Sequence, residues 1–284
     1  MYSFKKCIEV SDRQIYEAFR DGFADYIIQA NMTQEQLISR FFGIEGNERE
    51  LSFVAFRNNR PIGIILGGIK TGEIFKTLRC GAMSLIPEER GSGVATKLFE
   101  LHEGLARDIG CKQLFLEVID SNDRAISFYK KMGYEKIYDL TYMNWEIENK
   151  EIIVQGNNPL SNAISVISHE DLYSLREEEF SHLPWQGEFS YFKQLSCNYY
   201  GIREDDRLIA GLAGAKNKIL YIWVNPRYRL KGYARALLNR LIVDTDTQKL
   251  NITYTNNSEL HTFAKHYGME KNKINQLEMY KWLY

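Results

Sequence analysis

The chain contains an internal repeat, and this repeat restricts its fold more than any other feature. One copy is Met83–Leu98 (MSLIPEERGSGVATKL) and the other is Ile222–Leu237 (IWVNPRYRLKGYARAL). Each copy has an apolar strand, a proline, an arginine three residues later and then Gly-x-Ala, so both contain Arg-x-x-Gly-x-Ala. Two copies of one strand-turn-helix passage predict a duplicated α/β protein.

A second block strengthens the repeat. Asn122 is followed by Phe128 and by Gly133-Tyr-Glu-Lys136, and Asn257 is followed in the same spacing by Phe263 and by Gly268-Met-Glu-Lys271. The offset between the copies is slightly smaller in this block than at the turn, so the connection between the two blocks is shorter in the second half. An Arg-x-x-Gly-x-Ala hexamer alone is a weak signal, but the two blocks in one order are specific.

Length and composition agree with two domains. A chain of 284 residues, 44% hydrophobic and 26% charged, has the values of a globular protein and suits two cores of ordinary size. We expect a first domain over 1–147 that ends in a hairpin (134–147), and a second domain over 163–284. The polar stretch 148–162, with Gly-Asn-Asn-Pro at 156–159, is predicted to be a linker.

Charge and cysteine content argue against several classes. The net charge is −1 without long runs of one sign, which is untypical of proteins that bind nucleic acid or membrane surfaces. The N-terminus has no signal-peptide pattern and no apolar run is long enough to span a bilayer, so we expect a cytoplasmic protein. The four scattered cysteines favour reduced thiols over a metal site or a disulfide framework. A homodimer is left open.

The first copy of the turn is a candidate phosphate site. Gly91, Ser92, Gly93 and Ala95 allow a ligand to approach the main chain, the helix N-terminus attracts anions, and Arg90 adds positive charge. The alternative is a tight turn that needs glycine only for its conformation. A dinucleotide fingerprint does not fit, because Thr96 stands at the third glycine position and the turn lies in mid-domain. A Walker loop is not present either.

The helix after this turn is predicted to present one apolar stripe to the core. Val94, Leu98, Leu101, Leu105 and Ile109 recur at helical spacing. Gly110 is expected to end the helix.

Three consecutive motifs together resemble the GNAT (Gcn5-related N-acetyltransferase) family. They are Pro-x-x-Arg-x-x-Gly-x-Ala at 87–95, Leu-Glu-Val-x-x-x-Asn at 116–122, and Ala-Ile-x-Phe-Tyr-x-x-x-Gly-Tyr at 125–134. The resemblance covers most of 1–147, while the second half resembles a degenerate member. It implies an α/β protein of two GNAT-like domains, each a mixed, mostly antiparallel central sheet flanked by helices.

The resemblance also implies a cofactor site. The family uses acetyl-CoA as co-substrate, without a metal, between the strands that end near Ile86 and Ile119. Leu85 and Ile86 would pair with the pantetheine arm like an added strand, and Asn122 would contact the same arm. The pyrophosphate would be held by the main chain of Arg90, Gly91, Ser92, Gly93, Val94, Ala95 and Thr96.

Two side chains are candidates for proton transfer. Glu117 interrupts an apolar strand and lies twelve residues before Tyr129. By resemblance, Glu117 would be the general base and Tyr129 the acid that protonates the departing thiolate. The alternatives are an outward-facing strand residue and an aromatic packed under the sheet. The oxyanion would be met by a main-chain N–H near Leu85 or Ile86.

The second half lacks these groups. Ile252 and Ala264 stand at the positions of Glu117 and Tyr129, and Leu230 and Lys231 replace Gly91 and Ser92. We therefore expect a structural or substrate-shaping role for 163–284.

By the same resemblance, the acceptor is expected to enter past 23–26, Asn31-Met32 and 138–142. There Asp25 is either a candidate for attracting a cationic amine or a solvated surface acid. The resemblance thus implies an acetyl-CoA-dependent N-acetyltransferase that transfers directly to a primary amine of a small molecule or peptide. The alternative is a non-catalytic acyl-CoA-binding or sensing protein.

Overall fold

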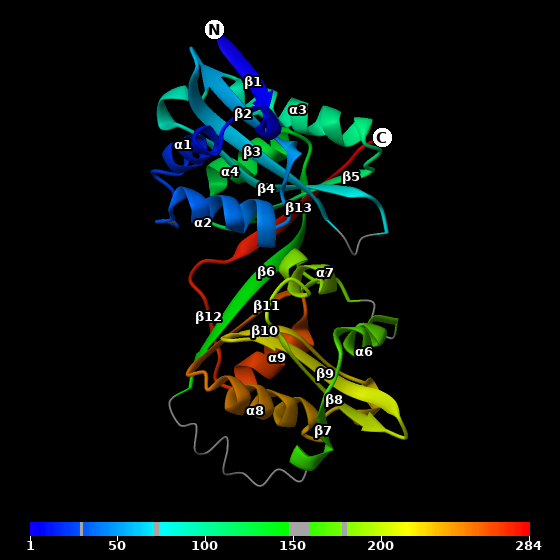
Figure 1. Cartoon of the computed structure of the whole chain (residues 1–284). Helices are drawn as coiled ribbons and strands as arrows, with labels where there is room; N and C mark the ends of the chain where they lie inside the picture. Colours follow the sequence, from blue (N-terminus) through cyan, green and yellow to red (C-terminus); the bar gives the residue numbers. More distant parts are fainter. Residues whose placement is uncertain (29–30, 71–73, 148–159, 178–180) are drawn as a thin grey trace. The chain divides into compact units, whose positions relative to one another are not determined.

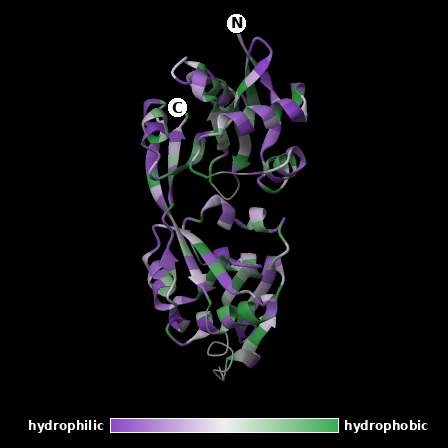
Figure 2. Cartoon of the chain, turned by 90° about the vertical axis from the view of Figure 1, so that its left-hand side faces the viewer, coloured by the Kyte–Doolittle hydropathy of each residue, from purple (hydrophilic) through white to green (hydrophobic). Residues whose placement is uncertain are grey.

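In a computed structural model, the chain forms two compact units. The structure describes residues 1–28, 31–70, 74–147, 160–177 and 181–284. The first unit combines Met1–Tyr138 with the C-terminal segment Gln276–Tyr284, and the second is Asp139–Asn275 (Figure 1). Each unit has its own hydrophobic cores. Figure 2 shows hydrophobic residues along the strands and helices of both.

The first unit is a mixed sheet in the order β1-β2-β3-β4-β5-β13, in which β4 and β5 are parallel and the other neighbours antiparallel. Its strands are β1 (Tyr2–Lys6), β2 (Glu48–Arg57), β3 (Arg60–Lys70), β4 (Thr77–Leu85), β5 (Gln113–Ile119) and β13 (Gln276–Trp282). Its helices are α1 (Asp12–Gly22), α2 (Gln34–Ser39), α3 (Val94–Asp108) and α4 (Asp123–Lys131). Helices α1 and α2 pack on one face of the sheet, and α3 and α4 pack on the other.

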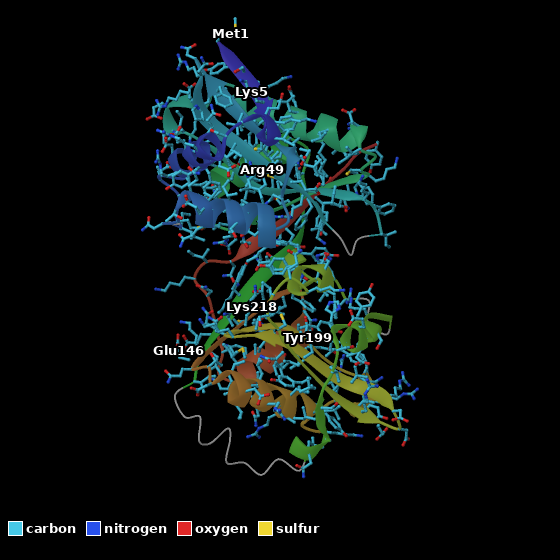
Figure 3. The ribbon with its side chains drawn as sticks, viewed as in Figure 1. Met1, Lys5, Arg49, Glu146, Tyr199 and Lys218 are labelled. Atoms are coloured by element: carbon cyan, nitrogen blue, oxygen red, sulfur yellow. The ribbon has the colours of Figure 1, made fainter. Side chains whose placement is uncertain are left out.

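The second unit repeats this plan with strands in the order β6-β11-β10-β9-β8-β7, and β12 pairs with β6. Its strands are β6 (Glu135–Glu146), β7 (Ile164–Val166), β8 (Asn198–Glu204), β9 (Arg207–Ala215), β10 (Lys218–Val224), β11 (Lys249–Thr255) and β12 (Glu270–Lys271). Its helices are α6 (His169–Tyr173), α7 (Phe189–Phe192), α8 (Tyr233–Thr245) and α9 (Ser258–His266). Figure 3 marks Tyr199 and Lys218 on β8 and β10 of this unit, and Lys5 and Arg49 on β1 and β2 of the first.

The two units share local turn chemistry. Asn58 and Asn59, between β2 and β3, have φ angles of 49° and 67°. Asp205 and Asp206, between β8 and β9, have φ angles of 47° and 64°. Two consecutive residues with positive φ make the tight hairpin turn that matches the twist of antiparallel strands, and Asn and Asp tolerate that conformation.

Helix α3 differs in part from its predicted stripe. Val94 and Leu98 are buried as expected, but Leu101 and Leu105 are only half-buried. The other fully buried residues of the helix are Phe99, His102 and Ala106. The buried face of α3 is therefore rotated relative to the predicted stripe and includes His102. A search for apolar residues at helical spacing does not find a buried histidine. Gly110 has a φ of 78° just beyond the helix, as its capping role predicts.

The largest difference from the sequence prediction is an exchange of strands. The predicted hairpin at 134–147 is one continuous strand, β6, whose residues from Leu140 to Glu146 pair with β11 of the second unit. The place beside β5 is taken instead by β13, from the C-terminal end of the chain (Figure 1). Alternating hydrophobicity identifies a strand but not the strand with which it pairs.

Because of this strand exchange, the two units differ from the predicted domains 1–147 and 163–284 and the predicted linker 148–162. The first unit is discontinuous, because Gln276–Tyr284 completes its sheet. Residues 148–159 of the predicted linker lie outside the described residues. All four cysteines are free thiols in the structure. No helix within the described ranges is long and apolar enough to cross a bilayer.

Candidate active site

The first unit contains a place where two parallel strands separate, which we call the β4–β5 fork. Strands β4 and β5 are paired from Thr77 and Gln113 as far as Cys80 and Leu116. Beyond this point β4 runs on to Leu85 and β5 to Ile119, and no further pair joins these described segments. Gly81 is an extra residue in the β3–β4 register, which steps from the Cys80–Gly67 pair to the Ala82–Leu66 pair. Such a bulge bends a strand, which accounts for the departure of β4 from β5.

The repeated turn lies at the end of the β4 branch of the fork. Its first part is a short 3₁₀ turn, Pro87–Glu89, and the buried Glu89 carboxylate holds it by accepting hydrogen bonds from Arg57 Nη1 (2.6 Å) and Tyr2 Oη (2.8 Å). Gly91 and Gly93 follow with φ angles of 79° and 87°. A Cβ atom added at either glycine would meet no atom of the described part of the chain within 4 Å. The main chain of the turn therefore faces open space that a ligand can enter.

The start of α3 supplies the hydrogen-bond donors of this turn. The Lys97 N–H donates to Gly93 O at 3.0 Å, which is the first bond of the helix. The N–H groups of Val94, Ala95 and Thr96 precede that bond and have no acceptor within the helix. The Ser92 hydroxyl donates to Glu89 O at 2.6 Å and so tightens the turn. The predicted pyrophosphate site is thus brought together as a main-chain cradle at the positive end of a helix dipole.

The Arg90 side chain braces the turn. Its Nε donates to Leu85 O at 3.1 Å, and Nη1 and Nη2 bind the two carboxylate oxygens of Asp25 at 2.5 and 2.6 Å. The hydrogen bond from Arg90 lowers the pKa of Asp25 to about 2. The positive charge expected at the turn is therefore balanced by Asp25, and Asp25 is not free to attract an amine. The pair ties the segment after α1 to the turn.

The main-chain N–H groups of Leu85 and Ile86 point to opposite sides of β4. The Ile86 N–H donates to Ile62 O at 2.9 Å, so that it is already used by β3. Because successive residues of a strand direct their N–H groups to opposite sides, the Leu85 N–H is directed toward β5. Of the two predicted donors for an oxyanion or for pantetheine, Leu85 is the one on the fork side.

Asn122 is positioned by its role as a helix cap. Its Oδ1 accepts a hydrogen bond from the Ala125 N–H at 3.2 Å, and in the second unit Asn257 caps α9 in the same way, from the Leu260 N–H at 2.9 Å. Asparagine is among the preferred N-cap residues. Capping is therefore enough to explain why this asparagine occurs in both halves.

Tyr129 lies on α4 against the core beneath the fork. Its ring centroid is 5.5 Å from that of Phe99 and 6.1 Å from that of Tyr134. Burial raises the pKa of the Tyr129 hydroxyl well above its usual value, and electrostatic interactions with Cys80 and Tyr26 raise it further. Cys80 is the last residue of β4 that pairs with β5, and Tyr26 lies in the segment between α1 and α2. The hydroxyl is therefore protonated at neutral pH and lies close to the point of the fork.

Glu117 is the first residue of β5 beyond the last β4–β5 pair, and it is half-buried. Its neighbour Leu116 belongs to the same core cluster as Tyr129. Since side chains alternate along a strand, Glu117 leaves β5 on the opposite face. The structure thus brings Glu117 and Tyr129 to the same end of the fork but from opposite faces of β5.

Sequence reasoning missed three residues near this site. Cys80 marks the point of the fork, and burial raises the pKa of its thiol to about 12. His102 is fully buried, neither of its ring nitrogens has a hydrogen-bond partner among the described residues, and burial lowers its pKa to about 3. Glu278 lies on β13 directly opposite Glu117. Of the three, only Glu278 had a signal in the sequence, because it lies among alternating residues that are typical of a strand. Among the described residues, no three His, Cys, Asp or Glu side chains converge as metal ligands would.

The corresponding turn of the second unit keeps the backbone path but not the open space. Leu230 and Gly232 have φ angles of 60° and 87°, close to those of Gly91 and Gly93. Arg229 Nε donates to Val224 O at 3.0 Å, and its Nη1 binds Glu259 at 2.6 Å. Leu230 is fully exposed in front of the turn, and a Cβ at Gly232 would lie 3.7 Å from Leu160. The residues aligned with Glu117 and Tyr129, Ile252 and Ala264, are buried in the apolar core.

Several known proteins are similar to this chain. The curated N-alpha-acetyltransferase 30 of Schizosaccharomyces pombe is 33% identical over 96 residues, which are 31% of the chain and 62% of that protein. The thialysine N-epsilon-acetyltransferase of Bos taurus is 41% identical over 51 residues, 18% of the chain and 30% of that protein. The N-alpha-acetyltransferase of Saccharolobus solfataricus is 30% identical over 125 residues, 40% of the chain and 75% of that protein.

Solved structures share the fold over the whole chain. A GCN5-related N-acetyltransferase from Sphaerobacter thermophilus aligns with a TM-score of 0.68 and 12% identity, covering 99% of this chain and 95% of that one. A tandem GNAT protein from the clavulanic acid biosynthesis pathway aligns with a TM-score of 0.64 and 14% identity, covering 99% and 98%. The sequence pattern of the acetyltransferase (GNAT) family matches twice, at residues 13–134 and 165–269. The chain therefore belongs to the GNAT acetyltransferase family and contains two copies of its fold.

Proposed function

We propose that the first unit transfers an acetyl group from acetyl-CoA directly to a primary amine of a peptide or small molecule. The observation that carries this proposal is the β4–β5 fork. An open glycine turn lies at the end of one branch, and the two predicted proton-transfer residues lie where the strands separate. The second unit has the same backbone turn without the open space or either of these residues.

The cofactor contacts follow from the donors that the fork offers. Acetyl-CoA supplies a thioester whose carbonyl carbon accepts the amine. The main chain of Arg90–Thr96 would bind its pyrophosphate, since the first-turn N–H groups of α3 have no helical acceptor and Gly91 and Gly93 leave room for close approach. The Leu85 N–H would pair with the pantetheine arm or donate to the oxyanion, and Asn122 would lie beside the arm while it caps α4.

Two proton transfers complete the reaction. Glu117, as general base, would take a proton from the ammonium group of the acceptor, so that the free amine can attack the carbonyl carbon. The C–N bond forms, the C–S bond breaks, and Tyr129 would give its phenolic proton to the departing thiolate. The second proton lost by the amine nitrogen would restore the phenol, and Glu117 would release its proton to solvent. Because burial raises the pKa of Tyr129, its proton is retained until charge develops on the sulfur.

Direct transfer is supported by the protonation state of Cys80, the thiol at the last β4–β5 pair. An intermediate acetylated on cysteine would require a thiolate, and the pKa of Cys80 is raised to about 12 by burial. A thiol with this pKa is almost entirely protonated at pH 7 and is a poor nucleophile. Cys80 is therefore assigned a packing role beside Tyr129.

The relatives guide the choice of acceptor. Two of them are named as N-alpha-acetyltransferases and another as a thialysine N-epsilon-acetyltransferase. The acceptor panel should therefore contain peptides with free N-termini, as well as free amino acids and their side-chain amines.

The test is an acceptor screen with the purified full chain and acetyl-CoA. Release of CoA thiol is followed for each amine, and mass spectrometry locates the acetyl group on the product. We expect release that depends on one class of acceptor and that is lost in the Glu117→Gln and Tyr129→Phe variants. Acetyl-CoA binding without acceptor-dependent release over the panel would instead favour an acyl-CoA-binding or sensing protein.

A further inference from the structure

The strand exchange places a buried carboxylate opposite the proposed base. In the register of β5 and β13, Glu278 is the direct partner of Glu117. Direct partners on antiparallel strands project from the same face, with Cβ atoms about 4.5–5.5 Å apart. The Glu278 side chain is completely buried (0% exposed), so water does not screen it from Glu117. The C-terminal strand thus brings a second carboxylate to the β4–β5 fork.

Other charged and titratable groups share this face of the sheet. Lys70 on β3 is 5% exposed, and its Nζ lies 5.3 Å from the ring centroid of Phe115, two residues before Glu117 on the same face. Arg79 on β4 is 4% exposed and is the register partner of Phe115. It donates to Glu45 O, and at 3.2 Å to Asn47 Oδ1, in the segment after α2.

Two tyrosines complete this environment. Tyr280 on β13 stacks on Phe115 at 4.9 Å between ring centroids, and Tyr138 lies 6.4 Å from Tyr280. The face of the sheet that carries the carboxylates of Glu117 and Glu278 thus also carries two buried cations, Lys70 and Arg79. This balance makes burial of Glu278 tolerable, because a buried charge is retained only with opposite charge or hydrogen bonds nearby.

We propose that Glu278 is a positioning residue for Glu117, whose negative charge makes Glu117 a stronger base than it would be beside the cations alone. The inference rests on the proposed function of Glu117. A neighbouring carboxylate favours the protonated form of a carboxyl group, whereas Lys70 and Arg79 favour the ionised form. Removing the Glu278 charge therefore weakens Glu117 as a base whatever the cations contribute. The first unit consequently depends on the last strand of the chain for its chemistry as well as for its sheet.

The test is the Glu278→Gln variant of the full chain, which keeps the size of the side chain and removes its charge. The pH profile of kcat/KM is measured with acetyl-CoA and a single amine from the acceptor screen. Because the amine is the same throughout, its own ionisation cannot shift between variants. We expect the acidic limb of the profile to move down by about one pH unit and the plateau to fall by roughly three-fold. The dissociation constant of acetyl-CoA should stay the same.

Two further variants separate the possible results. Lys281→Gln removes a charge from the other face of β13, where Lys281 binds Glu103 at 2.5 Å, and should leave the limb in place. Glu278→Asp keeps the charge and should return the limb toward its wild-type position, and it serves as the test if Glu278→Gln does not fold. An unmoved limb in Glu278→Gln, or a change only in the KM for the amine, would overturn the proposal.

The Glu117→Gln variant distinguishes this failure from failure of the proposed function. If Glu117→Gln keeps full turnover, Glu117 is not the base and the proposed mechanism fails together with this inference. If Glu117→Gln loses turnover while Glu278→Gln keeps the wild-type limb, only the positioning role of Glu278 is wrong.

Discussion

The turns before α3 and α8 have nearly the same backbone and different surroundings. Both have positive φ angles at the residue after the arginine and at the following glycine. In both, the arginine Nε donates to the carbonyl five residues earlier, and its guanidinium binds an acid, Asp25 in the first unit and Glu259 in the second. The repeated arginine is therefore explained by bracing the turn. What differs is the space in front of the turn, which is open at Gly91 and occupied by the exposed side chain of Leu230.

A second difference between the units lies in the helix that follows each turn. A Cβ on Gly67, which pairs with Cys80, would lie 3.3 Å from His102 of α3. In the second unit a Cβ on Gly214, which pairs with Ile219, would lie 2.5 Å from Leu241 of α8. His102 and Leu241 thus occupy corresponding places, since each follows the arginine of its turn at the same spacing. The first unit carries polar groups where the second is apolar.

The largest expected effect comes from the tyrosine that the second unit lacks. Tyr129→Phe should bind acetyl-CoA as wild type does but lose turnover by roughly 10²–10⁴-fold, because the thiolate loses its proton donor. Tyr267→Phe is the matched control, since Tyr267 is a partly buried tyrosine at the end of α9, and it should leave turnover unchanged. Steady-state kinetics of CoA release measure both. Equal turnover in wild type and Tyr129→Phe would remove the acid role.

Exchanging the residues at the two turns separates backbone conformation from space. Gly91→Leu should weaken acetyl-CoA binding by roughly ten- to one-hundred-fold, measured by calorimetry, because the side chain fills the approach to the turn. Leu230 shows that leucine can adopt this conformation, so a loss of binding would reflect bulk more than a broken turn. The reciprocal Leu230→Gly should stabilise the second unit by about 0.5–1 kcal/mol by relieving a left-handed backbone. Unchanged binding in Gly91→Leu would argue against a pyrophosphate at this turn.

The buried histidine should make the stability of the first unit depend on pH. The pKa of His102 is about 3 in the folded chain and about 6.5 when unfolded, so the unfolded chain takes up a proton between these values and the folded chain does not. Stability is therefore full above pH 6.5 and falls as the pH is lowered, by about 2 kcal/mol at pH 5.

His102→Leu, which introduces the residue of the second unit, should remove this part of the pH dependence. It should also add about 1–2 kcal/mol at pH 7, since two buried nitrogens without partners are replaced. Urea unfolding at pH 5 and 7 measures both quantities. If the free energy of unfolding changes equally between pH 5 and pH 7 in wild type and variant, His102 is not the group that titrates.

The smallest expected effect concerns the two arginine–acid pairs. Asp25→Asn leaves the charge of Arg90 unbalanced and should tighten acetyl-CoA binding by about two- to five-fold at low salt, less at high salt. Glu259→Gln at the second turn is the control and should leave the affinity unchanged. Because Arg90 lowers the pKa of Asp25 to about 2, the pair persists as the pH falls to about 4 and is lost near pH 2. It therefore adds no pH dependence to binding between pH 5 and 9. A weaker affinity in Asp25→Asn would show that the pair orders the turn for the cofactor.

The sequence by itself determined the features that depend on nearby residues. The repeat predicted the duplicated α/β fold and located the turn in each half, and three motifs of the first half predicted the family. It also showed that only the first half carries Glu117 and Tyr129, since both are replaced in the second. These features follow from local backbone preference and from periodicity. Both depend on residues close together in the sequence and not on tertiary contacts.

Only the tertiary structure decided which strand lies beside β5. An alternating pattern is satisfied by any partner that covers the same face, so 134–147 read as a hairpin of its own half, whereas β6 and β13 pair elsewhere. That choice brought Glu278 opposite Glu117, although the whole second unit separates them along the chain. The bracing of Arg90 by Asp25 and the burial of His102 were likewise settled by packing between distant segments. Pairing over such distances depends on the whole core, and no local signal in the sequence records it.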